Sequence, residues 1–233
     1  MVASLAVSVI WQKRGDFLKL LKSQQFILVF IFILISQSLF SQSDKNALDL
    51  WHAGRYESAV AVCKNELENL PKSSFAERMD SYTVLCWALL SLKRYDDVVK
   101  YGTEAYNKSS RDWRIIASLG EAQYNLGNNK EALYLFEKYI ELKNSGEKAG
   151  YVYYLMGHLF LRMEEYNRAD MALTMAVSLK PLDAKWWARL GYAREQAKDY
   201  QRAKDAYNKA LSINSSLVDA ERGKKRVHES LGL

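Results

Sequence analysis

The residues of this sequence best suited to catalysis or metal binding are three histidines and two cysteines. His52, His158 and His228 lie far apart in the chain, and Cys63 and Cys86 are separated by 23 positions without a Cys-x-x-Cys motif. Zinc sites and nucleophilic sites need such residues at short, characteristic spacings. The sequence contains neither a Ser/His/Asp arrangement nor a glycine-rich phosphate loop. It therefore predicts no catalytic site, no metal site and no cofactor.

Positive charge is the second chemical feature, because the formal net charge is +6. Half of this excess lies in residues 1–25, and acidic and basic residues are interspersed through the rest. The one dense basic run contains Arg222, Lys224, Lys225 and Arg226. A nucleic-acid partner requires a wider basic surface. We interpret the run as a solvated helix face near a C-terminus and expect no nucleic-acid partner.

An internal repeat indicates how the chain positions its residues. Two stretches match at a shift of 34 residues, with large residues on large ones and small residues on small ones. The matched positions are Tyr153, Gly157, Tyr166, Ala169, Leu173 and Ala176 in one stretch and Trp187, Gly191, Tyr200, Ala203, Tyr207 and Ala210 in the other. A fixed period of this length is typical of stacked helical arrays.

The second stretch carries a recognisable pattern. Trp187, Leu190, Gly191, Ala203 and Tyr207 have the spacing of the tetratricopeptide consensus, so the chain resembles the tetratricopeptide-repeat (TPR) family. The resemblance implies an all-α fold, a right-handed α-solenoid of about five helix–turn–helix units. The units begin near residues 40, 79, 113, 150 and 184 and occupy 44–216, and residues 217–233 form a polar capping helix. Longer spacings predict extended loops at 71–79 and 143–149.

The small residues of the repeat predict close packing of its two helices. We expect Gly157 to meet Ala169 and Gly191 to meet Ala203, so that the backbones approach closely. Gly191→Leu should then disrupt the packing, whereas Gly223 in the capping helix should tolerate a larger side chain.

The cysteines fall at inward positions of neighbouring units. We interpret Cys63 and Cys86 as buried thiols that act as small hydrophobic residues. A disulfide between them is the alternative, and it depends on an oxidising compartment.

The resemblance also implies a ligand-binding groove lined by the first helix of each unit. The predicted ligand-binding residues are Trp51, Trp87, Tyr124, Tyr151, Tyr154, His158, Arg162 and Tyr192. Aromatic residues and arginine on a concave surface are typical of binding hot spots. The alternative is that these aromatic residues pack within the fold. The family's clamp for acidic chaperone tails is absent, because Asp44 and Leu48 occupy its first-unit positions.

The N-terminal leader, residues 1–43, predicts export. Its apolar core spans 26–40, which is short for a membrane-spanning helix of about 20 apolar residues, and small residues follow at Ser41 and Ser43. This arrangement favours a secretory signal peptide, with a mature chain beginning at Gln42 or Asp44. An uncleaved signal anchor in the inner membrane is the alternative. The long segment before the core also admits a true start near Leu20 or Leu21.

These features predict an exported, periplasmic or cell-envelope protein without enzymatic activity. It would act as an adaptor or scaffold that binds a protein or peptide partner through its groove, alone or in a membrane complex. The alternative function is a periplasmic accessory of a transport system, binding a small apolar solute in an aromatic-lined groove. Fold analogy gives that alternative little weight.

Overall fold

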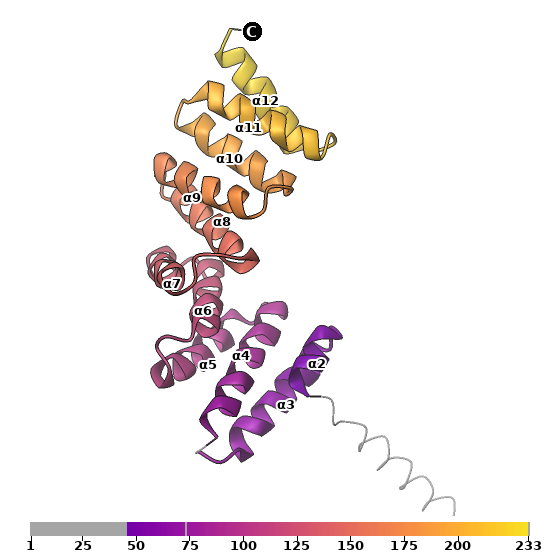
Figure 1. Ribbon diagram of the computed structural model, residues 1–233, viewed down its shortest axis with the longest axis vertical. Coiled ribbons are helices and arrows are strands. Elements are labelled where there is room, and N and C mark those ends of the chain that lie inside the picture. The colour runs from indigo at the N-terminus through magenta and orange to yellow at the C-terminus, as the bar shows by residue number, and fades with distance from the viewer. Residues whose placement is uncertain (1–45, 73, 233) are drawn as a thin grey trace, which may run out of the picture. The chain divides into compact units, whose positions relative to one another are not determined.

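The computed structural model describes residues 46–72 and 74–232. These residues form eleven α-helices and no strand (Figure 1). The helices are α2 (Ala47–His52), α3 (Tyr56–Asn69), α4 (Phe75–Ser91), α5 (Tyr95–Lys108), α6 (Trp113–Asn125), α7 (Asn129–Leu142), α8 (Glu147–Arg162), α9 (Tyr166–Leu179), α10 (Ala184–Gln196), α11 (Tyr200–Ile213) and α12 (Val218–Ser230).

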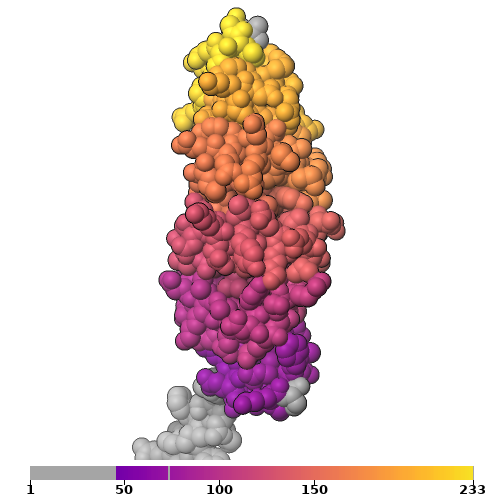
Figure 2. Space-filling view, turned by 90° about the vertical axis from the view of Figure 1, so that its left-hand side faces the viewer, coloured from indigo at the N-terminus to yellow at the C-terminus, as the bar shows by residue number. Residues whose placement is uncertain are grey.

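The helices pair into five hairpins, α2–α3 to α10–α11, followed by the single helix α12. Each hairpin packs against its neighbours in chain order (Figure 2). This confirms the predicted fold class, an all-α solenoid of five helix–turn–helix units with a C-terminal capping helix. The predicted leader, 1–43, with its apolar core, 26–40, lies outside the described residues. Among the helices that are described, none is long and apolar enough to cross a membrane.

All five turns inside the hairpins have the same geometry. The second residue after each first helix is left-handed: Gly54, Lys93, Gly127, Glu164 and Lys198 have φ between 58° and 82°. Its N–H donates to the carbonyl three residues back, and the next N–H donates to the carbonyl five residues back. This is the Schellman motif, which satisfies the last carbonyls of a helix. The second helix of the hairpin starts two residues after the left-handed residue, so the motif keeps each turn short.

The extended loops predicted from the unit spacings are shorter than expected. Residues 75–79 lie in α4 and residues 147–149 lie in α8. Helices α4 and α8 have 17 and 16 residues, whereas α6 and α10 have 13 each. The extra residues of these units therefore add about one turn at the start of the first helix.

The predicted contact between small residues is wrong in detail. A Cβ atom on Gly157 would lie 2.5 Å from Cγ of Leu173, and one on Gly191 would lie 2.8 Å from the ring of Tyr207. In each of these two hairpins the glycine therefore leaves space for a large side chain of the second helix. That side chain lies four positions after the alanine that we expected to meet the glycine. Ala169 is fully buried beside this contact, but it is not the residue that fills the space.

In the second hairpin the glycine lies on the second helix and the larger residue lies on the first helix. Cys86 replaces the glycine of the first helix, and Gly102 replaces the large residue of the second helix. A Cβ atom on Gly102 would lie 2.8 Å from Leu119 of the following hairpin and 3.7 Å from Sγ of Cys86. Both Cys63 and Cys86 are buried, free thiols. Burial raises the pKa of each to about 12, with a smaller contribution from Glu66 at Cys63 and from Cys63 at Cys86.

The capping helix is fixed by a buried tyrosine. Tyr207 on α11 lies between Gly191 on α10 and Gly223 on α12, and a Cβ atom on Gly223 would lie 2.2 Å from Cζ of Tyr207. The Tyr207 hydroxyl donates to Glu195 at 2.6 Å, and Arg226 donates two hydrogen bonds to the same carboxylate. The expectation that Gly223 tolerates larger side chains is therefore wrong. Its position is as crowded as that of Gly191.

Candidate functional site

The first helices of the hairpins carry all eight predicted groove residues. Seven of these side chains are half-buried or exposed between neighbouring hairpins, and Arg162 is exposed at the end of α8. First helices of successive units contact one another, in the pairs α2 with α4, α4 with α6, and α6 with α8. The predicted residues are therefore on one series of helices, but the structure divides them into separate clusters.

Trp51 and Trp87 form the N-terminal cluster. Their ring centroids are 5.4 Å apart with the planes at 45°, and Nε1 of Trp51 donates to Oγ of Ser91 at 3.3 Å. The edge of His52 contacts Trp51 at a centroid distance of 5.0 Å. These rings join α2 to α4, so packing between units accounts for part of their surface.

Four predicted residues meet in the central cluster. The guanidinium of Arg162 lies 4.2 Å from the ring centroid of Tyr124, whose hydroxyl is 3.5 Å from Nδ1 of His158. His158 lies 4.5 Å from the ring of Tyr154, which stacks on Trp186 at 5.0 Å and 15°. We call this continuous row of Tyr124, Arg162, His158, Tyr154 and Trp186 the aromatic wall. It runs from α6 across α8 to α10.

The electrostatics of the aromatic wall keep His158 neutral. Burial, followed by the positive charges of Arg189 and Arg162, lowers the pKa of His158 from 6.5 to about 4. Its Nε2 atom is buried and has no hydrogen-bond partner among the described residues. Burial also raises the pKa of Tyr154, and Arg189 offsets part of that effect. At neutral pH the wall is therefore uncharged except for its arginine.

Tyr151 lies apart from this wall. Its hydroxyl donates to Glu121 at 3.1 Å, and Lys148 pairs with the other oxygen of the same carboxylate at 3.1 Å. Lys148 also lies 4.9 Å from the Tyr151 ring centroid. Burial, with Glu121, raises the pKa of Tyr151. This side chain therefore links α8 to α6, and its hydroxyl is already occupied.

Tyr192, the last predicted residue, opens onto a cavity of about 390 Å³. Tyr154 lines the same cavity, so the aromatic wall is continuous with it. Lys185 and Arg189 of α10 and Arg222 of α12 also line it. Sequence reasoning missed Arg189 as a site residue and assigned Arg222 to a solvated face. The available signal was the spacing of four between Lys185 and Arg189, which places both on one side of a helix.

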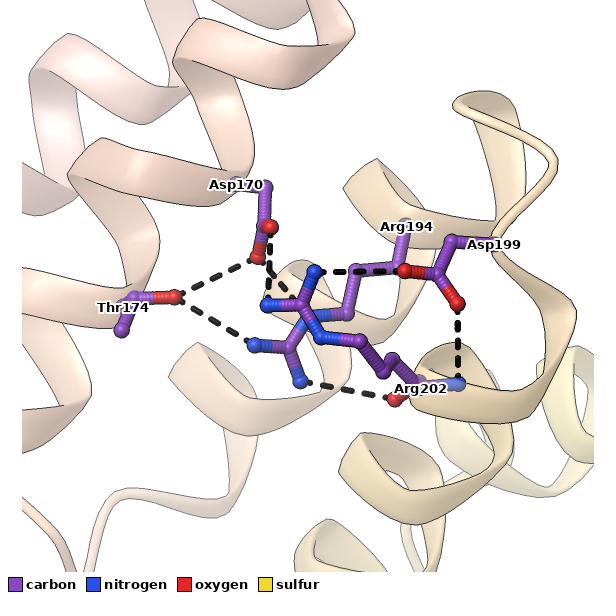
Figure 3. Close-up of polar contacts among 5 residues, drawn as sticks. All are labelled: Asp170, Thr174, Arg194, Asp199 and Arg202. Carbon is purple, nitrogen blue, oxygen red and sulfur yellow. Dashed lines mark hydrogen bonds and ion pairs between the residues drawn. The ribbon is translucent and has the colours of Figure 1, made fainter.

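A polar network holds α10 against the fourth hairpin (Figure 3). Asp170 on α9 accepts a hydrogen bond from Nε of Arg194 at 2.8 Å and pairs with Arg202 on α11 at 3.1 Å. Asp199 caps α11 by accepting from the backbone N–H of Arg202 at 3.2 Å. The Asp170 and Arg194 side chains are only 17% and 11% exposed. The network therefore fixes α10, the helix that carries Tyr192, Lys185 and Arg189.

Within residues 46–72 and 74–232, no three histidine, cysteine, aspartate or glutamate side chains are grouped to hold a metal ion. The aromatic wall and the cavity offer groups suited to recognition. Flat aromatic surface, one exposed guanidinium and a cationic cavity can bind a ligand by stacking and ion pairing.

Comparisons with known proteins agree with this geometry. A family model described as tetratricopeptide repeat matches residues 154–217, and one described as bacterial transcriptional activator domain matches residues 40–145. A search of curated proteins found no match.

Several solved structures share the fold. A structure of MamA from Desulfovibrio magneticus is 20% identical over 66% of this chain and 85% of that chain, with a TM-score of 0.60. YrrB is 16% identical over 68% and 84%, with a TM-score of 0.61. A tetratricopeptide repeat protein from Parabacteroides merdae is 13% identical over 80% and 71%, with a TM-score of 0.64.

The hairpins, their shared turns and the wall along their first helices define a helical-repeat protein with a recognition surface. Residues 154–217 match the tetratricopeptide-repeat family model, and the solved structures share the arrangement of helical hairpins. The chain therefore has the tetratricopeptide-repeat fold.

Proposed function

We propose that this protein is an exported, non-enzymatic scaffold that binds a protein or peptide partner along the aromatic wall. The observation that carries the proposal is the continuity of that wall from Tyr124 to Tyr154 and on to Tyr192 at the cavity. Rigid aromatic side chains supply contact area at a small cost in conformational entropy. A row of them across three first helices suits an extended peptide or a helix of a partner.

The fold supports the same proposal by analogy. YrrB is described as a TPR protein with an unusual peptide-binding site. At 16% identity this likeness extends to the fold alone and assigns no peptide-binding residue in this chain.

The surroundings of the wall favour a peptide over a small apolar solute. Such a solute needs an enclosed and mostly apolar cavity. The cavity beside Tyr154 is lined by arginine and lysine, and the one beside Tyr151 is lined by Glu147, Lys148 and Lys180. Polar walls of this kind match a peptide with charged side chains.

Export rests on the sequence of residues 1–43. We propose a cleaved signal peptide, with a mature chain that begins at Gln42 or Asp44, in the periplasm or cell envelope. N-terminal sequencing of the native protein tests this step. Recovery of intact residues 1–40 would instead indicate a membrane anchor.

Partner binding is tested by replacing a residue that continues the aromatic wall and contributes little to folding. Tyr154 is unsuitable alone, because it stacks on the buried Trp186. Tyr192 is 37% exposed and lines the cavity. We expect Tyr192→Ala to reduce capture of a native envelope partner while the circular-dichroism melt stays close to that of the wild type.

Tyr134 supplies the matched control, since it is an exposed tyrosine on α7, a second helix. Tyr134→Ala should change neither capture nor the melt. A stable Tyr192→Ala variant with undiminished capture would refute the wall as the binding surface.

A further inference from the structure

The cavity at the C-terminal end of the array is a concentrated positive site. It lies between α10 and α12 and has a volume of about 390 Å³. Two pairs of cations line it, Lys185 with Arg189 on α10 and Arg222 with Arg226 on α12. The members of each pair are four residues apart, so each helix presents its pair on one side. Asp219 is the one carboxylate in the lining.

Three of these cations have no ionic partner among the residues that the structure describes. Arg226 is neutralised by Glu195, which it contacts through Nε at 2.6 Å and Nη2 at 2.8 Å. Lys185, Arg189 and Arg222 form no ion pair with any described carboxylate. Like charges brought together in one cavity repel one another unless an anion joins them.

The basic residues of α12 lie on different sides of the helix. Gly223 packs on Tyr207 and Val227 is fully buried, so the apolar side of α12 faces the fifth hairpin. Arg222 and Arg226 flank this side and line the cavity. Lys224 and Lys225 are absent from the lining. The capping helix therefore contributes one wall of a cavity in addition to covering the array.

Apolar and aromatic surface accompanies the charge. Tyr192, Tyr154, Leu217 and Ala188 also line the cavity. Arg189 lies 6.0 Å from the Tyr192 ring centroid. A ligand suited to this lining combines negative charges with at least one apolar or aromatic group.

We infer that this cavity binds an acidic peptide segment of the protein partner, with carboxylates on Lys185, Arg189 and Arg222 and an apolar side chain against Tyr192 and Leu217. The inference rests on the proposed scaffold function and specifies its partner. Arginine binds carboxylates through two parallel hydrogen bonds. A nucleic acid would need cations along an extended surface to follow its phosphates. Lys185, Arg189 and Arg222 instead line one cavity, which Asp219 also lines.

A fluorescein-labelled peptide Glu-Glu-Tyr-Glu-Glu-Leu tests this inference by fluorescence anisotropy with the full chain. We expect it to bind at low salt and to weaken as the salt concentration rises. The same peptide with Gln in place of Glu should bind at least about tenfold more weakly. Equal binding of the two peptides would overturn the inference. Tighter binding of a labelled single-stranded oligonucleotide than of the Glu peptide would also overturn it.

Two charge-matched variants locate the site. Lys185→Gln/Arg222→Gln removes two cavity cations and should weaken the Glu peptide by about tenfold or more. Lys224→Gln/Lys225→Gln removes the same amount of charge outside the cavity and should change the affinity less than about twofold. Equal losses in the two variants would show binding through net charge and would overturn the inference. If both variants still capture the envelope partner, the acidic-peptide inference fails while the scaffold function stands.

Discussion

Gly223→Ala is the substitution that tests how the capping helix is attached. Its Cβ atom would lie 2.2 Å from Cζ, 2.5 Å from Cε1 and 2.6 Å from the hydroxyl oxygen of Tyr207. The ring cannot retreat easily, because Gly191 is on its other side and Glu195 holds its hydroxyl. Alanine in an open helical position would stabilise by about 1 kcal/mol relative to glycine. Overpacking costs about 1–3 kcal/mol, so we expect a net loss of up to about 2 kcal/mol instead of that gain.

Urea denaturation measures the loss, and hydrogen exchange locates it. Terminal units of repeat proteins open locally, so the amides of α12 should lose protection before those of α6. Lys225→Ala, an exposed change on the same helix, is the control and should have little effect. Combining Gly223→Ala with Tyr207→Leu should recover part of the clash energy, since Leu173 fills the equivalent space against Gly157. A Gly223→Ala variant that is about 1 kcal/mol more stable than the wild type, as at an open helical position, would refute this packing.

Three further predictions concern a titrating residue, a turn and the polar network. Because the pKa of His158 is lowered to about 4 from 6.5, the folded state binds fewer protons there than the unfolded state, and stability falls as pH falls through this window. His158→Gln should flatten the fall in melting temperature between about pH 7 and pH 4.5, and an unchanged slope would contradict the shift. Lys93 has φ of 58° in its turn, so Lys93→Gly should raise the free energy of unfolding by about 0.5–1 kcal/mol in urea denaturation, and a decrease would show that the turn is not strained. Arg194→Met leaves the carboxylate of Asp170 without its shortest partner and should cost about 2 kcal/mol in the same assay, and adding Asp170→Asn should recover part of that cost; additive losses would contradict direct coupling.

The order of the helices was predictable because the repeat frame depends on residue size at fixed spacing. Gly157 and Gly191 marked the crowded side of each first helix, and that assignment follows from the sequence alone. The sequence did not indicate which residue fills the space beside each glycine. Leu173 and Tyr207 occupy it because large side chains on the second helix reach across the hairpin, whereas Ala169 ends at Cβ.

The candidate site was predictable in composition and less so in arrangement. Positions on the first helices indicated Tyr124, Tyr154 and His158, and these three meet in the structure. The Tyr151 hydroxyl instead donates to Glu121 of the preceding unit. This hydrogen bond depends on how the two units stack. The cavity position of Arg222 was hidden for a similar reason. The rotation of α12 is set by its contact with Tyr207, which a linear basic run does not reveal.

Site-specific photocrosslinking tests the central claim that the first-helix surface binds the partner. A photoreactive phenylalanine derivative placed in turn at Tyr192 and at Tyr134 reports what lies beside each position in the native cell. Both tyrosines are exposed, at 37% and 53%, but Tyr192 continues the aromatic wall and Tyr134 lies on α7. The account predicts a discrete crosslinked partner at position 192 and none at position 134. A partner crosslinked from position 134 and absent at position 192 would contradict it.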